Sequence, residues 1–341
     1  MTSRNLMLNA AMTALVALAV PVQSSAQTYT TFDPPNSTGT QPTAINPAGA
    51  ITGFYVEATS PNQGFVRAAD GTITTFAAPG ASQGTQPAAI SATGAITGDY
   101  IDANGVNHGF LRAKDGTITT FDAPGAGTGP GQGTQPDSIN PGGVITGSSC
   151  DAAMCHGFVR TKDGRFTIFD LPGSGGTFPA SINPAGTITG NYLAALNPFQ
   201  SVPRGFVRSA TGAITVNFPS TFFEDTPTAI NPAGTVAGTF ADGTGDHYFL
   251  RAADGAITTF DPTDLFFIPL AVSINQEGAA TGFFISFING PPGFESFLRA
   301  PDGKFAVIAD PNAGTVFSKA PRPLASTRLE RSREATLMRT A

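Results

Sequence analysis

The sequence predicts an all-β fold, a β-propeller of six blades with four antiparallel strands each, and two observations predict it. A phrase of the type Ile-Asn-Pro-Ala-Gly recurs at spacings of 45, 49, 43, 48 and 44 residues, and its copies begin at Ile45, Ile90, Ile139, Ile182, Ile230 and Ile274. Between Gln27 and Pro311, no run longer than nine residues lacks both glycine and proline. Both residues are costly inside a helix, so short strands separated by turns remain.

Each unit offers four strands, and the second unit shows them in order. The first ends near Ser91, and the others cover Ala95–Tyr100, His108–Ala113 and Thr117–Asp122. They are rich in β-branched and aromatic residues, which suit a pleated surface. A tight turn of the type Asn-Pro-Ala-Gly joins strands one and two. In five of the six units Asp-Gly joins strands three and four, a hairpin signal because glycine accepts a positive φ.

A further copy of the fourth strand precedes the first unit. The segment Thr28–Pro35 reads TYTTFDPP, like TITTFDAP at Thr117–Pro124. A strand from the N-terminus can complete the last blade and close a ring. Six blades are therefore expected, with seven blades or an unusual closure as the alternative.

The first 26 residues predict a secretory signal peptide. Arg4 supplies a positive start, Leu6–Val20 is an apolar core, and Ser24–Ala26 is a small-x-small cleavage site. No later stretch has the length of a membrane-spanning segment. We therefore expect a secreted protein, extracellular or periplasmic, of bacterial type.

The predicted propeller domain, residues 27–310, is acidic, and the segment that follows is basic. Residues 27–310 hold 11 Lys+Arg and 22 Asp+Glu, whereas residues 311–341 hold 6 and 2. An acidic body argues against nucleic acid as a partner, because phosphate binding needs a basic face. The basic tail departs from the repeat and is expected to be disordered. We expect the chain to be a monomer.

Cys150 and Cys155 are the two cysteines, and they flank one short loop. In an oxidising compartment such a pair forms a disulfide, the interpretation favoured over two free thiols. The disulfide is predicted to staple one hairpin.

The repeats resemble a bacterial extracellular family named for a His-Ala-Phe tripeptide. The counterparts here are SINPAGTITGNY at Ser181–Tyr192, with HGFLR at His108–Arg112 and HGFVR at His156–Arg160. The likeness covers nearly all of residues 28–310. Glycine or tyrosine replaces the family's alanine, and arginine stands where the family often has tryptophan. The resemblance implies an exported repeat protein of propeller type, and it implies no established catalytic residues.

An arginine recurs in every unit, two residues after a phenylalanine on the same side of strand three. The six are Arg67, Arg112, Arg160, Arg208, Arg251 and Arg299. We expect each stem to pack over phenylalanine while the guanidinium pairs with an acid after the fourth strand, at Asp33, Asp122, Asp170 or Asp261. The alternative is a ring of guanidinium groups that holds an anionic ligand.

The three histidines, His108, His156 and His247, occupy one repeat position in different units, so they do not predict a single catalytic centre. No catalytic residue, cofactor or metal site is predicted. Calcium is the alternative, because Asp102–Gly105 and Asp242–Asp246 resemble fragments of calcium loops, although asparagine and aspartate also favour turns.

Antiparallel order places the strand 2–3 loops and the unit crossings on one face, and the near-invariant turns on the other. The first face carries the variation in length and sequence, as binding surfaces commonly do. The candidate ligand-binding residues there are Asp102, His108, Asp151, His156, Phe199, Asp242, Asp246, His247, Phe287 and Phe294.

The leading hypothesis is an exported, non-catalytic binding or surface-interaction protein, whose partner is a polysaccharide or another exported protein. One alternative is a propeller enzyme acting on glycans, a lyase or a hydrolase. It would need a carboxylate pair that converges on one cavity. The other alternative is a purely structural envelope protein.

Overall fold

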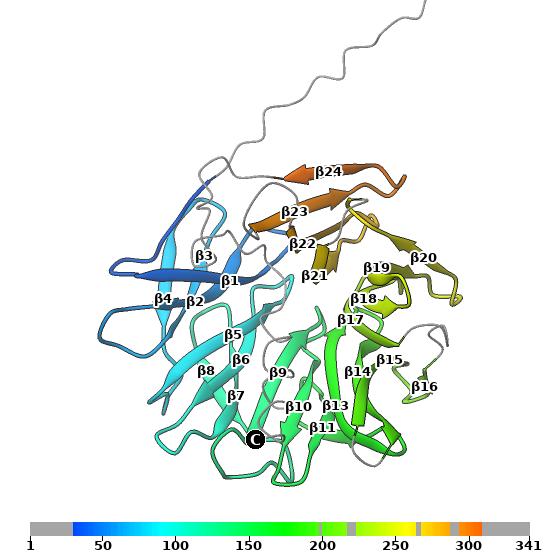
Figure 1. Cartoon of the computed structure of the whole chain (residues 1–341). Coiled ribbons are helices and arrows are strands. Elements are labelled where there is room, and N and C mark those ends of the chain that lie inside the picture. Colours follow the sequence, from blue (N-terminus) through cyan, green and yellow to red (C-terminus); the bar gives the residue numbers. More distant parts are fainter. Residues whose placement is uncertain (1–29, 198–199, 217–222, 264–266, 287–292, 309–341) are drawn as a thin grey trace, which may run out of the picture. The chain divides into compact units, whose positions relative to one another are not determined.

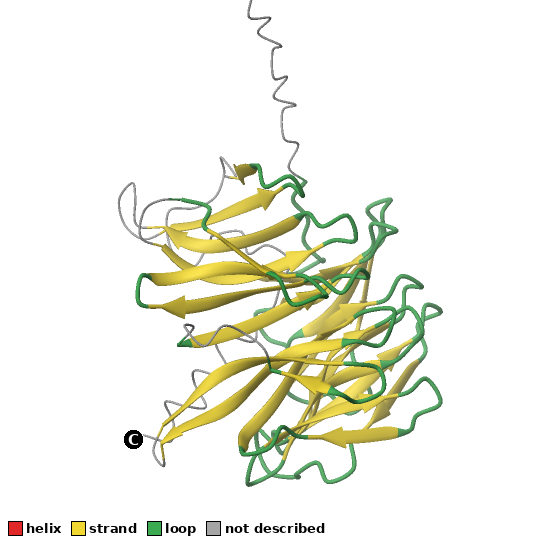
Figure 2. Ribbon diagram, turned by 90° about the vertical axis from the view of Figure 1, so that its right-hand side faces the viewer, coloured by secondary structure: helices red, strands yellow, loops and turns green. Residues whose placement is uncertain are grey.

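A computed structural model describes residues 30–308 except 198–199, 217–222, 264–266 and 287–292. The predicted signal peptide, residues 1–26, and the basic tail, residues 311–341, lie outside the described residues. The chain divides into two compact units, and every strand belongs to the second unit, which begins at Asp33. Strands, turns and loops make up the described residues, which contain no helix and hence none that could cross a membrane (Figure 2).

The described part of the chain contains twenty-four strands, four to each repeat unit. The first strands of the units are β1 (Gly39–Ile45), β5 (Gly84–Ile90), β9 (Gly133–Ile139), β13 (Ser174–Ile182), β17 (Glu224–Ile230) and β21 (Phe267–Ile274). The second strands are β2 (Ile51–Val56), β6 (Ile96–Ile101), β10 (Ile145–Cys150), β14 (Ile188–Asn197), β18 (Val236–Asp242) and β22 (Ala280–Ser286). The third strands are β3 (Gln63–Arg67), β7 (Asn107–Arg112), β11 (Cys155–Arg160), β15 (Gln200–Arg208), β19 (Gly245–Arg251) and β23 (Gly293–Arg299). The fourth strands are β4 (Ile73–Phe76), β8 (Ile118–Phe121), β12 (Phe166–Phe169), β16 (Ile214–Thr215), β20 (Ile257–Phe260) and β24 (Phe305–Ile308).

Each unit forms a four-stranded antiparallel sheet in simple up-and-down order (Figure 1). A single parallel pairing, Asn107 with Gly133, joins the second and third sheets into one eight-stranded sheet. This is the strand arrangement of propeller blades that the repeats predict. The sheets are called sheet 1 to sheet 6 below, in chain order.

The Asp-Gly hairpins form as the sequence predicts. The glycines after the aspartate have φ values of +93°, +96°, +88°, +96° and +89°, at Gly71, Gly116, Gly164, Gly255 and Gly303. This left-handed backbone favours glycine. In the first unit the Asp70 carboxylate accepts a 2.9 Å hydrogen bond from the amide of Thr72, which fixes the turn from the aspartate side as well.

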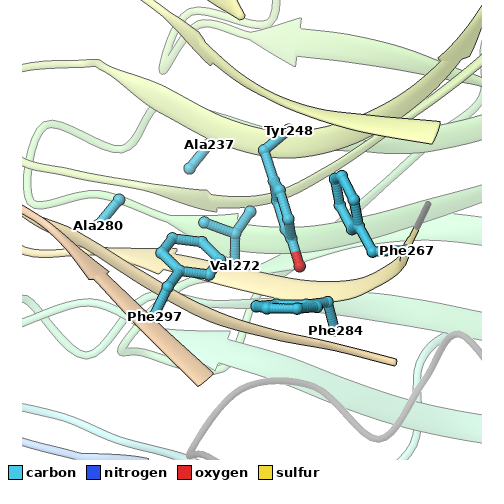
Figure 3. Packing of buried hydrophobic residues seen from close by; sticks show 7 residues of the cluster. All are labelled: Ala237, Tyr248, Phe267, Val272, Ala280, Phe284 and Phe297. Carbon is cyan, nitrogen blue, oxygen red and sulfur yellow. The ribbon is translucent and has the colours of Figure 1, made fainter. Parts of the chain in front are cut away.

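The buried hydrophobic side chains of the described residues form five clusters, each between two consecutive sheets. Figure 3 shows the one between sheets 5 and 6, where Tyr248 lies among Phe267, Phe284 and Phe297. The Tyr248 ring is fully buried, and its hydroxyl donates a 2.7 Å hydrogen bond to the carbonyl of Phe283 in sheet 6. Sheet-to-sheet contact, and no single central core, therefore holds the units together.

A phenylalanine from four of the fourth strands, β4, β8, β12 and β20, packs against the next unit's third strand. The Phe76 ring lies edge-on to Phe110 at 6.0 Å, and the Arg112 guanidinium lies 4.9 Å above the same ring. The same arrangement places Arg160 over Phe121, Arg208 over Phe169 and Arg299 over Phe260. A guanidinium over a ring face is attracted by the ring quadrupole.

The predicted pairing of these arginines with the acids after the fourth strand is wrong. Asp122, Asp170 and Asp261 pair with histidines of their own sheets, and Asp33 accepts a hydrogen bond from Thr40. The arginines lie at the opposite end of the third strand. The Nη1 atom of Arg112 donates to the carbonyl of Ala113 at 3.4 Å, and Arg208, Arg251 and Arg299 do the same with the residue that follows each.

The asparagine of each Ile-Asn phrase links its unit to the next one. The Asn46 side chain donates to the carbonyl of Ser91 at 3.1 Å, and the same bond joins Asn140 to Asn183, Asn183 to Asn231 and Asn231 to Asn275, at 3.2–3.3 Å. The oxygen of each amide accepts a backbone amide within its own turn, such as that of Ala50. These residues form an asparagine ladder, and Ser91 interrupts it.

The two end sheets expose residues that the other sheets bury. Ile45 is 54% exposed, whereas its counterparts Ile90, Ile139, Ile182 and Ile230 are 6–8% exposed. Leu298 of sheet 6 is 44% exposed, although its counterpart Leu250 packs against the next cluster. Residues 30–35, the described part of the N-terminal copy, form no strand, and β24 is already the fourth strand of sheet 6. The number of blades in a closed ring stays a prediction.

Replacing Ser91 with asparagine is expected to complete the ladder. The Ser91 hydroxyl already accepts the amide of Ala95, as the asparagine oxygens do in other units. The new amide would reach the carbonyl of Asn140, so Ser91→Asn should stabilise the fold by about 1 kcal/mol, a rise in Tm of about 2 °C. Thermal unfolding followed by circular dichroism measures the change.

Asn183→Ala is the matched control, because it removes a bond of the same ladder. It should lower Tm by at least as much as Ser91→Asn raises it. If both substitutions lower Tm equally, the ladder does not stabilise the joints between units.

Candidate functional site

Opposite ends of the strands carry different chemistry. Up-and-down order brings the strand 2–3 turns, the ends of the fourth strands and the starts of the first strands to one side, here called the loop face. The strand 1–2 and 3–4 turns lie on the opposite side, here called the turn face. All of the predicted ligand-binding residues that the structure describes belong to strand ends or turns of the loop face.

His108 of sheet 2 lies between two aspartates. Its Nδ1 atom is 3.0 Å from a carboxylate oxygen of Asp122, which follows the fourth strand. Its Nε2 atom is 3.7 Å from Asp102 in the strand 2–3 turn. The imidazole ring stacks on Tyr100 with a centroid distance of 5.1 Å. A carboxylate can only accept, so Nδ1 carries the proton toward Asp122.

His156 and His247 repeat this arrangement in sheets 3 and 5. The Nδ1 atom of His156 is 2.8 Å from Asp170, and its Nε2 atom is 3.4 Å from Asp151. The corresponding partners of His247 are Asp261, at 2.9 Å from Nδ1, and Asp242, at 3.4 Å from Nε2. Each of these Asp-His-Asp groups is called a histidine cluster below.

The histidine and its two aspartates occur together within a unit. At the histidine position the first, fourth and sixth units have Gln63, Arg204 and Glu295, and Ala77 stands in the first unit where the three histidine units have the aspartate after the fourth strand. Within the six units, the aspartate at that position therefore occurs where a histidine is present to pair with it. Each histidine connects the strand 2–3 turn to the fourth strand, across the edge of its own sheet.

The turn aspartates of the clusters are held as carboxylates. The pKa of Asp102 lies below its usual value, chiefly because its carboxylate accepts the backbone amide of Val106. Backbone amides of Met154 and Ala153 lower the pKa of Asp151, and the Thr244 hydroxyl lowers that of Asp242. The pKa of His156 is raised above its usual value, mainly by the hydrogen bond to Asp170. Together these shifts favour an ion pair around His156.

The side chains of the histidine clusters face one another, which limits their use in acid–base catalysis. In each, both ring nitrogens face a carboxylate, and the hydrogen bonds and ion pairs of the cluster stay within one sheet. No grouping of three or more His, Cys, Asp or Glu side chains suited to a metal ion occurs among the described residues. The two fragments that resemble calcium loops use their first aspartates, Asp102 and Asp242, to accept hydrogen bonds from their own turns.

A disulfide joins Cys150 and Cys155, which are cross-strand partners at the ends of β10 and β11. It closes the strand 2–3 turn that contains Asp151, so it lies beside the His156 cluster. Asp246 belongs to β19 next to His247, but its carboxylate has no hydrogen bond or ion pair with a described residue. Phe199 and Phe287 lie outside the described residues, and of Phe294 only the backbone, in β23, is described.

Sequence reasoning missed a buried acid at the loop face. Asp225 of β17 is 1% exposed, and it accepts a hydrogen bond from the amide of Gly205 in the preceding sheet. The Arg204 guanidinium lies 3.5 Å away. Burial nevertheless raises the pKa of Asp225 to about 6. The available signal was an aspartate where other units have a buried threonine, at Thr85, Thr134 and Thr177.

Charge is divided unequally between the two faces. Of the lysines and arginines that the structure describes, all but Arg204 belong to the turn face or to strand ends beside it. The loop face holds the carboxylates of Asp33, Glu57, Asp102, Asp122, Asp151, Asp170, Glu224, Asp225, Asp242, Asp246, Asp261 and Glu295. The loop face is therefore strongly acidic, whereas the turn face mixes its lysines and arginines with the carboxylates of Asp70, Asp115, Asp163, Asp254, Glu277 and Asp302.

The sequence matches no protein-family model and no curated protein. Its structure is similar to solved β-propellers. A streptogramin B lyase superposes with a TM-score of 0.52 at 17% identity, over 82% of this chain and 86% of that chain. The β-propeller domain of the Trilobed protease from Pyrococcus furiosus, described as having an open velcro topology, superposes with a TM-score of 0.58 at 8% identity, over 80% and 84%. TolB from Acinetobacter baumannii gives 0.50 at 14% identity, over 75% and 62%. The fold is thus a β-propeller, as the repeats predict.

Asp170→Asn is expected to destabilise the protein more at pH 6 than at pH 9. A raised pKa means that protonated His156 stabilises the folded state. That stabilisation is complete below the unfolded value of about 6.5 and is lost as pH rises through the folded value. Asp163→Asn, in the turn face of the same sheet, is the control and should cost the same at both pH values. Thermal melts of the three proteins measure this, and an equal loss for Asp170→Asn at both pH values would contradict the assignment.

Asp225→Asn is expected to stabilise the protein at pH 8 and to have little effect at pH 4. The folded pKa of about 6 exceeds the ordinary value of 3.8, so the ionised carboxyl destabilises the fold, and this cost vanishes as pH falls below 4. The difference corresponds to about 3 kcal/mol at most. The amide oxygen still accepts the amide of Gly205. Urea unfolding at both pH values provides the measurement, and a loss of stability that is larger at pH 8 would show that Arg204 holds a favourable carboxylate.

Proposed function

We propose that this chain is an exported, non-catalytic binding protein that holds its ligand on the loop face. The observation that supports this most directly is the difference between the two faces in how much they vary from unit to unit. The turn face repeats the same short turns, and the loop face carries hairpins of different lengths together with the histidine clusters. In β14 and β15 the strand pairing runs on to Asn197 and Gln200, whereas β6 and β7 end their pairing at Ile101 and Asn107.

The acidity of the loop face restricts the ligand. Carboxylates such as those of Asp102, Asp151 and Asp246 repel acidic or sulfated polysaccharides. They accept hydrogen bonds from the hydroxyl groups of neutral sugars, and they attract basic groups of a protein. A neutral polysaccharide or a basic exported protein therefore fits this face, and nucleic acid does not.

The groups that a glycan hydrolase or lyase needs argue for binding over catalysis. A general acid requires a carboxyl group with a raised pKa that contacts the substrate. Asp225 has the raised pKa, but at 1% exposure it does not meet a substrate. The turn aspartates of the histidine clusters are accessible, but their pKa values are lowered.

Neutral and sulfated glycan arrays, together with a basic-protein panel, test the proposal on the mature chain with and without calcium. We expect binding that is confined to neutral glycans or basic proteins. Shortening the β14–β15 hairpin to the length of the β6–β7 hairpin and replacing Asp102 and Asp151 with asparagine should weaken it at least tenfold. The matched control replaces Asp70 and Asp115, of the turn face, with asparagine and should leave binding within about twofold.

Two results would overturn the proposal. One is binding that the turn-face variants abolish and the loop-face variants preserve. The other is turnover of a glycan that stops when His108, His156 or His247 is replaced with alanine.

A further inference from the structure

The crossing from sheet 2 to sheet 3 is hydrogen-bonded to both sheets at the loop face. Its residues 126–132, here called the bridge loop, are rich in glycine. On the side of sheet 2, Gly131 donates its amide to the carbonyl of Gly105 at 2.8 Å. The carbonyl of Gln132 accepts the backbone amide and the side-chain amide of Asn107, at 2.8 and 3.0 Å. The bridge loop is therefore fixed to the strand 2–3 turn of sheet 2.

The other side of the bridge loop contacts the disulfide-closed turn of sheet 3. Gly127 donates its amide to the carbonyl of Cys150 at 3.0 Å. A side chain has no room at Gly127, because a Cβ atom would lie 2.9 Å from the Cα atom of Asp151. The position of the bridge loop therefore depends on the conformation of the turn between Cys150 and Cys155.

The same turn positions one aspartate of a histidine cluster. One carboxylate oxygen of Asp151 accepts the backbone amides of Ala153 and Met154, at 2.7 and 2.9 Å. The other oxygen faces Nε2 of His156 at 3.4 Å. One short turn thus fixes both the bridge loop and the carboxylate on one side of His156.

Sheet 3 closes its strand 2–3 turn in a different way from sheet 2. The sheet 2 turn ends in Gly105, whose φ of +79° suits a three-residue hairpin loop. The sheet 3 turn, residues 151–154, contains no glycine, and neither Ala152 nor Ala153 has a positive φ. Two-residue hairpin loops favour positive φ, because turns of the opposite twist splay the strands. The disulfide therefore supplies a closure that the backbone of this turn does not favour.

We propose that the disulfide between Cys150 and Cys155 is a redox switch that controls the order of the loop face at sheets 2 and 3. Both cysteines are half-buried and lie beside the exposed residues Ala152 and Ala153, so a dithiol reductant can reach the sulfur atoms. One thiolate of the dithiol attacks a cystine sulfur and forms a mixed disulfide, which frees the other cysteine. The second thiol then displaces the first cysteine, so the dithiol becomes a disulfide and its two electrons and two protons pass to the cysteines.

Reduction is expected to act locally. Without the cross-link the turn can open, and the contacts of Asp151 with His156 and of Cys150 with Gly127 are lost with it. The hydrophobic cluster between sheets 2 and 3, which includes Phe158, does not involve the turn and keeps the sheets together. The loop face thus loosens while the fold persists. The switch needs no ligand and stands apart from the proposed function.

Hydrogen–deuterium exchange of the oxidised and the dithiothreitol-treated mature chain tests the switch. Reduction should speed amide exchange in the bridge loop and at Asn107 about tenfold, because the cross-link closes a short loop and its loss favours local opening. The sheet 5 turn, residues 242–245, contains no cysteine and should exchange equally in both states. The variant Cys150→Ala/Cys155→Ala should exchange like the reduced chain, with or without dithiothreitol. Equal exchange of the bridge loop in the oxidised and reduced chains would overturn the proposal.

Gly127→Ala tests the coupling between the turn and the bridge loop with the disulfide intact. The added methyl group should displace the loop from Asp151 and speed its exchange in the oxidised protein, and unchanged exchange would contradict the coupling. Melting curves confirm that each variant is folded.

Equilibration of the folded chain with glutathione, followed by alkylation and mass spectrometry, measures how readily the disulfide is reduced. We expect partial reduction in native buffer, as for exposed regulatory disulfides. A disulfide that glutathione reduces only in denaturant would overturn the switch. Faster exchange in all six sheets after reduction would overturn it as well, because the disulfide would then hold the whole fold together.

Discussion

The contact between one sheet and the next is the constraint on which the whole molecule depends. A four-stranded sheet of this kind buries little by itself, and all five hydrophobic clusters lie between consecutive sheets. Two devices recur at the joints that the structure describes. One is the fourth-strand phenylalanine between the next unit's phenylalanine and arginine, such as Phe76 with Phe110 and Arg112. The other is the asparagine ladder at the turn-face end. Because both devices reach into the next unit, the repeat must keep them identical, and the phrases that the sequence repeats are the ones that make these contacts.

The strands and turns are determined by residues within one repeat unit, and so they are predictable from the sequence. Proline, glycine and the alternation of apolar residues act over a few positions, and the Asp-Gly glycines have the expected positive φ. The contact partners of a repeated residue are not predictable in this way. Arg112 was expected to pair with the acid after a fourth strand, yet it lies over Phe76 of the preceding unit, and Asp122 pairs with His108. The repeat shows that these residues belong together, but a linear pattern does not show which end of a strand each occupies against its neighbour.

The candidate site, too, is predictable from the sequence only in part. The assignment of His108, His156 and His247 to one face depends only on strand order, and the structure places all three at the same edge. Their Asp-His-Asp geometry was not anticipated, because the second aspartate follows the histidine by 14 residues, on another strand. Asp225 was missed for a related reason. Its pKa is raised by burial between two sheets, and burial of a side chain that replaces a threonine is a tertiary property.

Differences between repeats are more informative about function than the repeats are. Every unit needs its arginine at the turn-face end of strand three, which concentrates positive charge there, whereas the loop-face end is free to vary. Acidic residues fill much of that variation, in the turns of the histidine clusters and at Glu224 and Asp246. The separation of charge between the two faces therefore has two causes. The arginines that build the joints lie at the turn face, and acidic residues occupy variable positions of the loop face. The same reasoning is why the proposed function assigns partner recognition to the loop face, and not to the centre of any one sheet.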